Sequence, residues 1–174
     1  LTLMLVVDVS GSGLFGSGEQ SKRELAAEIA SVLAFSAIRN NDKVGLILFT
    51  DEVEKFIPPR KGRRHVLRVI REILFHEPKR RGTDLNHALE FLTRVTPHRA
   101  IAVVVSDFLI DNTTTEAKAR SSHTALRQAN RRHDAVAVRI TDRFELELPP
   151  LGRLVLEDAE TGEVVAVNAG NARH

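Results

Sequence analysis

Two short apolar runs, each ending at an aspartate, most constrain the fold of this chain. Leu3 to Val7 reads LMLVV and runs into Asp8, and the segment RAIAVVVSDF reaches Asp107 in the same way. Continuous β-rich apolar runs of this length are typical of strands covered on both faces, as in a parallel sheet. The chain is therefore expected to be an α/β protein.

Along the rest of the chain, segments with the hydrophobic spacing of a helix alternate with segments typical of strands. The helix predicted at residues 24–39 has Leu25, Ile29, Val32, Leu33 and Ile38 on its apolar side. Further helices are expected at 62–77, 82–95 and about 115–132, and further strands at 44–49, 52–59 and 135–140. This order predicts a Rossmann-like doubly wound sheet, mostly parallel, with helices on both faces.

The pattern changes after about residue 142. Short strand-like runs flank the sequence ETGE, which predicts a C-terminal β-hairpin extension. We therefore divide the chain into 1–142, the main α/β unit, and 143–174, a β-rich extension of the same domain that ends in a frayed tail.

Composition excludes several classes of site. The 174 residues contain no cysteine, which excludes disulfides, thiolate nucleophiles and iron–sulfur clusters, and the net charge is only +2. No apolar stretch approaches the roughly 20 residues of a membrane span. The chain starts at Leu1 inside an expected strand, so we interpret it as a piece of a longer protein. We expect this piece to be cytoplasmic and without membrane contact of its own, with any membrane anchor upstream.

Oxygen side chains collect where the expected strands and loops end. Asp8, Ser10 and Ser12 follow the first strand at alternate positions, which share a side in an extended segment. Thr83 precedes a helix, with Asp84 as its expected start residue, and Asp107 closes the second apolar strand. Ligands of open α/β sheets bind beyond the carboxyl ends of the strands. Two carboxylates and three hydroxyls form a hard-oxygen set that suits Mg²⁺ or Mn²⁺.

These residues resemble the metal-ion-dependent adhesion site of von Willebrand factor type A domains. That site has the pattern D-x-S-x-S, then a distant threonine, then a distant aspartate, and the positions are filled here in order by Asp8, Ser10, Ser12, Thr83 and Asp107. The resemblance implies a non-catalytic module for protein–protein interaction. In such a module a divalent cation, Mg²⁺ or alternatively Mn²⁺ or Ca²⁺, bridges to an Asp or Glu of the partner.

A narrower resemblance covers more of the chain. The segments DKVGLILFTDEVEKFIPPRKGRRHVLRVIREIL, SDF and HDAVAVRITDRFELELPPLGRLVLEDAETGE are similar to the bacterial domain-of-unknown-function 58 family. That resemblance implies a MoxR-type AAA+ ATPase as a partner and a role in protein assembly or maturation. It also implies transmembrane helices upstream of this domain.

Two other functions compete with this interpretation. A Mg²⁺-dependent phosphoryl-transfer enzyme or hydrolase needs a free nucleophile or a base, and no His or Lys lies near Ser10 and Ser12 in the sequence. A nucleic-acid binder could use the basic cluster within residues 60–81, but such binding favours interleaved aromatics, and the chain has no Trp and no Tyr. We therefore expect neither an enzyme nor a nucleic-acid partner. Arg80 and Arg81, close to Thr83, could instead attract an acidic protein.

The histidines and the glycine-rich loop add no further site. The seven histidines show no metal-ligand spacing, and we interpret them as surface or loop residues. The sequence GSGLFGSG lacks the Lys-Ser/Thr that a phosphate-binding P-loop requires.

Overall fold

The computed structural model describes residues 1–10, 21–80, 82–108, 116–141, 153–157 and 164–168. Strands and helices alternate through most of the chain, as the sequence predicts. The elements in order are β1 (Thr2–Asp8), α1 (Lys22–Arg39), β2 (Lys43–Phe49), β3 (Val53–Arg60), α2 (Arg63–Phe75), α3 (Leu85–Val95), β4 (Ile101–Ser106), α4 (Glu116–Arg132), β5 (Asp134–Arg139), β6 (Arg153–Glu157) and β7 (Val164–Asn168).

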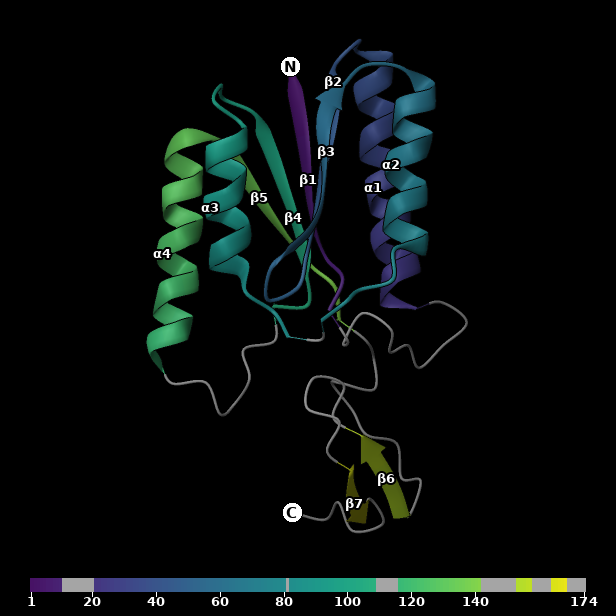
Figure 1. The fold of residues 1–174 in the computed structure, drawn as a ribbon, viewed down its shortest axis with the longest axis vertical. Coiled ribbons are helices and arrows are strands. Elements are labelled where there is room, and N and C mark those ends of the chain that lie inside the picture. Colours follow the sequence, from purple (N-terminus) through teal and green to yellow (C-terminus); the bar gives the residue numbers. More distant parts are fainter. Residues whose placement is uncertain (11–20, 81, 109–115, 142–152, 158–163, 169–174) are drawn as a thin grey trace.

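The main sheet has five strands in the order β3-β2-β1-β4-β5. β1 pairs in parallel with both β2 and β4, and β4 pairs in parallel with β5, whereas β3 is an antiparallel edge strand. The predicted doubly wound, mostly parallel sheet is therefore confirmed. Since β1, β2 and β4 run the same way, their carboxyl ends meet at one end of the sheet (Figure 1).

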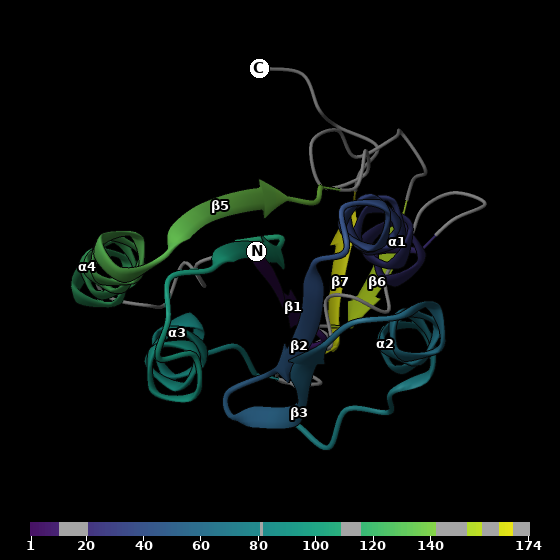
Figure 2. The same ribbon diagram turned by 90° about the horizontal axis from the view of Figure 1, so that it is seen from above.

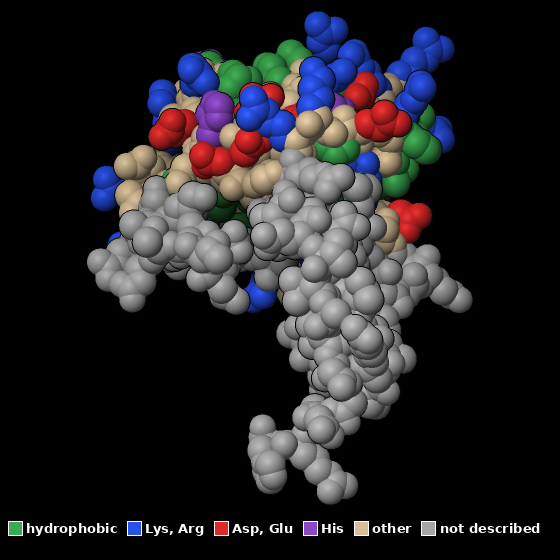
Figure 3. Space-filling model, turned by 60° about the horizontal axis from the view of Figure 1, so that its bottom comes forward, with side chains coloured by type: hydrophobic (Ala, Val, Ile, Leu, Met, Phe, Trp, Pro, Cys, Tyr) green, Lys and Arg blue, Asp and Glu red, His purple; other side chains and the backbone are tan. Residues whose placement is uncertain are grey.

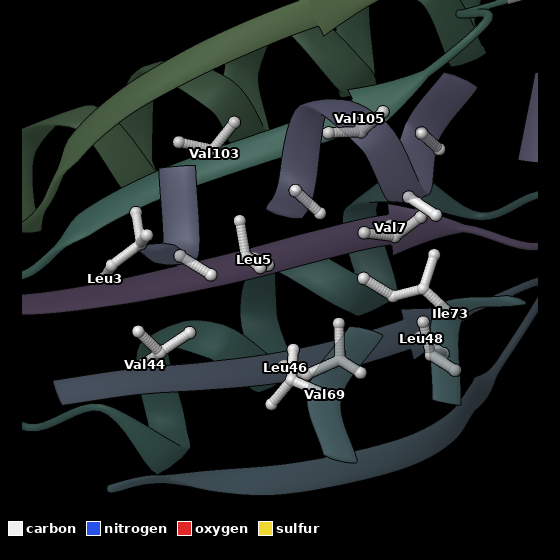
Figure 4. Packing of buried hydrophobic residues seen from close by; sticks show 14 of the residues in the cluster. Leu3, Leu5, Val7, Val44, Leu46, Leu48, Val69, Ile73, Val103 and Val105 are labelled. Carbon is white, nitrogen blue, oxygen red and sulfur yellow. The ribbon is translucent and has the colours of Figure 1, made fainter. Parts of the chain in front are cut away.

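Helices α1 and α2 cover one face of this sheet, and α3 and α4 cover the other, as Figure 2 shows from above. Alternate residues of β1 supply both layers, because successive side chains of a strand point to opposite faces. Leu3, Leu5 and Val7 pack with residues of α1 and α2, and Figure 4 shows this layer. Met4 and Val6 pack in the opposite layer with residues of α3 and α4.

Helix α1 packs on the sheet mainly through a stripe of alanines, not through the larger apolar residues on which the prediction rested. The fully buried apolar side chains are small: Ala26, Ala27, Ala30, Ala34 and Ala37. Leu25, Ile29, Leu33 and Ile38 flank this stripe and are partly buried, whereas Val32 is 67% exposed. Alanines let a helix backbone lie close to a crowded sheet, so side-chain size rather than hydrophobicity alone selected the buried face.

The C-terminal hairpin forms as a separate pair of strands. β6 and β7 are antiparallel, with Arg153 opposite Asn168 and Glu157 opposite Val164. The predicted turn at ETGE lies outside the described residues, and the division of the chain at residue 142 stays a prediction. In Figure 1 the hairpin lies beyond the carboxyl ends of the main sheet.

None of the helices in the described part of the chain combines the length and the apolar character needed to cross a bilayer.

His133 lies in the bend between α4 and β5, so it is a loop residue as expected, but it is not at the surface. It follows α4 directly, its side chain is fully buried, and neither ring nitrogen has a hydrogen-bond partner among the described residues. Burial lowers the pKa of His133, and the neighbouring Arg132 lowers it further. Burial therefore favours the neutral form of the ring. No sequence pattern indicates that His133 is buried, because it stands in the polar string RRHD.

The burial of His133 predicts a dependence of stability on pH. A histidine whose folded-state pKa lies below the unfolded value of about 6.5 binds its proton more readily after unfolding. The free energy of unfolding should therefore fall as the pH drops below about 6.5. In His133→Leu this part of the decline should disappear, because the titrating ring is gone. Urea unfolding at pH 5.5 and 7.5 checks this, and an equal pH dependence in both proteins would contradict it.

Candidate functional site

The strand ends bring two predicted ligands together. β1 and β4 are parallel neighbours with Val7 opposite Val105, so Asp8 at the end of β1 lies beside Ser106. The Ser106 hydroxyl donates a hydrogen bond of 2.7 Å to Asp8 Oδ2, although 98 residues separate them in the chain. Asp107 follows directly. The parallel register therefore places both predicted carboxylates at the same end of the sheet (Figure 1).

The Asp8 carboxylate is held through both oxygens. The backbone N–H of Ser10 donates to Oδ1 at 2.9 Å, while Ser106 binds the other oxygen. Ser106 is itself oriented by the backbone N–H of Phe108, which donates to its hydroxyl at 3.1 Å. Sequence reasoning missed Ser106, although its place just before Asp107 at a strand end was a usable signal.

Burial has the largest influence on the pKa of the Asp8 carboxyl. Loss of solvent raises the pKa of the Asp8 carboxyl above its usual range, and the nearby charge of Asp107 adds to the rise. The hydrogen bonds from Ser10 and Ser106 lower this pKa but do not cancel the effect of burial. An additional cation at this position would therefore stabilise the ionised carboxylate.

A lysine that the sequence analysis overlooked already supplies one cation. Lys22 Nζ lies 3.2 Å from Asp107 Oδ2, and both side chains are only 6% exposed. Lys22 opens α1, whose start is fixed by a capping box between Ser21 and Glu24. The cap and the packing of the α1 alanines on the sheet therefore decide where this ammonium lies.

Thr83 lies at the same end of the sheet, at the start of α3. The backbone N–H of Asp84 donates to the Thr50 carbonyl at 2.8 Å, just beyond β2, and Val9 donates to the Phe49 carbonyl at 2.9 Å. Asp84 caps α3 by accepting from the His87 backbone at 3.1 Å, which confirms it as a helix-start residue. Ser10 is buried next to Asp8, whereas Ser12 lies outside the described residues.

Glu54, which no sequence pattern singled out, anchors the loop that leads to Thr83. Its side chain is fully buried. The carboxylate accepts backbone bonds from Lys79 at 2.9 Å and Arg80 at 3.1 Å, one from the Thr50 hydroxyl at 3.1 Å, and contacts His76 Nε2 at 3.0 Å. Burial acts to raise the pKa of Glu54, but these hydrogen bonds outweigh it, and the pKa is lowered.

The available donors define the kind of metal that fits. Among the described residues, no three His, Asp or Glu side chains converge as a metal-binding group. A cation here would therefore depend on two carboxylates, Asp8 and Asp107, with hydroxyls from serine and threonine. Oxygen-only donors of this kind fit Mg²⁺ or Mn²⁺, which retain water in their remaining positions. The raised pKa of the buried Asp8 carboxyl also favours a bound cation at this position.

A small pocket adjoins the two aspartates. One wall comes from the start of α1 and the other from the ends of β4 and β5. It is lined by Asp8, Lys22, Arg23, Ala26, Val105, Ser106, Asp107 and Ile140. Figure 3 shows acidic and basic side chains interspersed over the described part of the face seen obliquely from this end.

The fold is of the kind found in von Willebrand factor type A domains. A von Willebrand factor type A domain from Catenulispora acidiphila superposes with a TM-score of 0.54 at 14% identity, over 78% of this chain and 32% of that one. BatB from Bacteroides thetaiotaomicron gives a TM-score of 0.61 at 18% identity, over 97% and 80% of the two chains. An aerotolerance-related membrane protein from Bacteroides fragilis gives 0.62 at 21% identity, over 97% and 82%. At these identities the likeness concerns the fold.

The chain belongs to the family described as "Protein of unknown function DUF58", whose model matches residues 1–174. Uncharacterised proteins of Mycobacterium tuberculosis and Mycobacterium bovis are 32% identical to it over 166 residues, which is 94% of this chain. The chain spans about half of the length of these relatives, since the match covers 50% of each.

The Glu54 anchor leads to a prediction about stability and pH. Because the folded-state pKa of Glu54 is lowered, its contribution to stability is present above the unfolded-state value of about 4.3 and is lost as the pH falls through the folded-state value. Glu54→Gln should therefore lower the free energy of unfolding at pH 7 by about 1–3 kcal/mol. The difference from the wild type should shrink under acid conditions, as measured by urea unfolding between pH 3 and 7.

Glu52→Gln is the matched control for this measurement. Glu52 is in the same turn, but its side chain is 44% exposed and pairs with the exposed Arg80. An exposed pair contributes little, so the control should change stability by less than about 1 kcal/mol. Equal losses in the two variants would contradict the anchoring role of Glu54.

Proposed function

We propose that this domain is a non-catalytic, metal-dependent module for protein–protein interaction. The observation that carries the proposal is that two strand-end aspartates line one pocket, and that burial raises the pKa of one of them, Asp8. The predicted ligands are Asp8, Ser10, Ser12, Thr83 and Asp107. Mg²⁺ is the proposed cation, with Mn²⁺ or Ca²⁺ as alternatives. When bound, the cation supplies charge and an open coordination position for an Asp or Glu of the partner.

The donor set supports capture of a carboxylate rather than catalysis. Two protein carboxylates only balance a divalent ion, and Lys22 already engages one of them, so an acidic ligand is favoured on charge grounds. Hydrolysis or phosphoryl transfer would need a base close to the attacking group. The residues that line the pocket include no histidine, and its lysine is engaged with Asp107. We therefore favour binding over turnover.

The arrangement of the basic residues does not support a nucleic-acid surface. Arg60 pairs with Val44 near the start of β2, at the opposite end of the sheet from the aspartates. Arg80 lies in the loop near Thr83, where it contacts Asp51 at 3.0 Å and Glu52 at 3.2 Å. The two basic runs of the sequence are thus separated, and the charge of Arg80 is already offset by two acids. Its attraction for an acidic partner is correspondingly reduced.

A MoxR-type AAA+ ATPase, or a client protein presented to it, is the partner class that we propose from the family resemblance. Such a partner would present an Asp or Glu to the metal during protein assembly or maturation. The interaction should then be lost in EDTA, restored by Mg²⁺, and insensitive to added nucleic acid.

Calorimetry tests the proposed metal site directly. Mg²⁺ and Mn²⁺ are titrated into the wild type and into Asp8→Ala, each with and without an acidic peptide. We expect binding in the wild type that tightens with peptide, because the peptide carboxylate offsets the charge of the cation. In Asp8→Ala we expect affinity to fall by at least about tenfold, since a directly or water-bridged carboxylate is removed.

Asp134→Ala serves as the control for the loss of a carboxylate. Asp134 is exposed at the start of β5, where it pairs with Arg99, away from the strand ends that carry Asp8. This variant should bind metal as the wild type does. If the wild type binds neither ion under any condition, the metal mechanism is wrong.

A further inference from the structure

The buried pair of Lys22 and Asp107 has a consequence for how the proposed metal would bind. Lys22 Nζ and Asp107 Oδ2 lie 3.2 Å apart with both side chains 6% exposed, so solvent screens this contact weakly. An ammonium at this place is a positive charge held against a predicted metal ligand. It therefore neutralises Asp107 when no metal is bound.

Arg23 adds a second positive charge to the same pocket. Its Nη1 donates to the His76 carbonyl at 2.6 Å, whereas its Nε and Nη2 are buried and have no hydrogen-bond partner among the described residues. Loss of solvent lowers the pKa of Arg23. Two cations from the first turn of α1 and two carboxylates, Asp8 and Asp107, thus line one pocket.

This balance changes the energetics of a divalent ion at the site. Before any metal arrives, the formal charges of the four side chains sum to zero. A divalent cation would therefore enter with its charge uncompensated and would share Asp107 with an ammonium that repels it. A carboxylate from outside the chain reduces the excess by one unit.

We propose that Lys22 is a resident cation that keeps metal affinity low until a partner's carboxylate arrives, and so couples the binding of metal to the binding of the partner. This inference rests on the proposed function of the site. Coupling of this kind is reciprocal, so metal should raise the affinity for the acidic ligand by the same factor as the ligand raises the affinity for metal. Asp8 and Asp107 would serve as ligands in either case, but Lys22 would decide when they are occupied.

The location of Lys22 also predicts an effect on the metal-free protein. Removing the ammonium takes away the cation that lies 3.2 Å from the buried Asp107 carboxylate, which costs stability. A bound divalent ion would restore the missing charge. A Lys22 variant should therefore be less stable than the wild type without metal and should gain more stability from Mg²⁺.

Lys22→Met tests the inference because methionine retains the length of the side chain without its charge. Mg²⁺ is titrated calorimetrically into the wild type, Lys22→Met and Lys22→Gln, with and without a short acidic peptide. We expect Mg²⁺ alone to bind both variants about tenfold or more tightly than it binds the wild type. The enhancement by peptide should be smaller in the variants. Thermal melts in EDTA and in Mg²⁺ should show a lower Tm in EDTA and a larger rise with Mg²⁺.

Lys55→Met is the matched control, because it removes a lysine that pairs with Glu72 at 3.7 Å on the surface, outside the pocket. It should leave the affinity for Mg²⁺ unchanged. If the wild type binds Mg²⁺ and the Lys22 variants bind it no more tightly, the resident-cation role is overturned while the proposed function stands. If no protein binds Mg²⁺ with or without peptide, both fail. Lys22 variants that remain unfolded in saturating Mg²⁺ would also overturn the role, by showing that the lysine is needed for folding.

Discussion

The parallel pairing of β1 with β4 is the constraint on which the site depends. It places Asp8 beside Ser106, and the 2.7 Å bond between them joins segments that are far apart in the chain. The same pairing puts Asp107 one residue further along, next to the start of α1. A sheet in which these strands ran in opposite directions would carry the two aspartates at opposite ends. The order and direction of the strands therefore bring the site residues together, and the side-chain contacts follow from that arrangement.

The balance of charges around the two aspartates is the second constraint on the site. Burial raises the pKa of Asp8, whereas Asp107 has Lys22 against it. Around them, the loop that carries Thr83 is held by Glu54, and Arg80 is held by Asp51 and Glu52. The interior of the site and its rim are each close to charge balance. A divalent cation that binds together with a carboxylate disturbs this balance less than the cation alone does.

Sequence patterns anticipated the fold because they reflect local geometry. The apolar runs of β1 and β4 have the composition of strands covered on both faces, and Val66, Val69 and Ile73 mark the buried side of α2 at helical spacing. Asp84 was identified as a helix start because capping is also a local preference. The prediction for α1 was less successful. Its larger apolar residues indicated one face, but the alanine stripe packs on the sheet and Val32 is exposed.

The sequence by itself determined the order of elements, the parallel sheet and the five oxygen-bearing positions that resemble an adhesion site, since each follows from residue types at short or ordered spacing. Only the tertiary structure decided that Ser106 holds Asp8, that Lys22 neutralises Asp107, that Glu54 anchors the loop before Thr83, and that His133 is buried. These contacts join residues from different elements or depend on which side of a helix meets the sheet. Their free energies come from burial and from neighbouring charges, and no local pattern in a single sequence records either one.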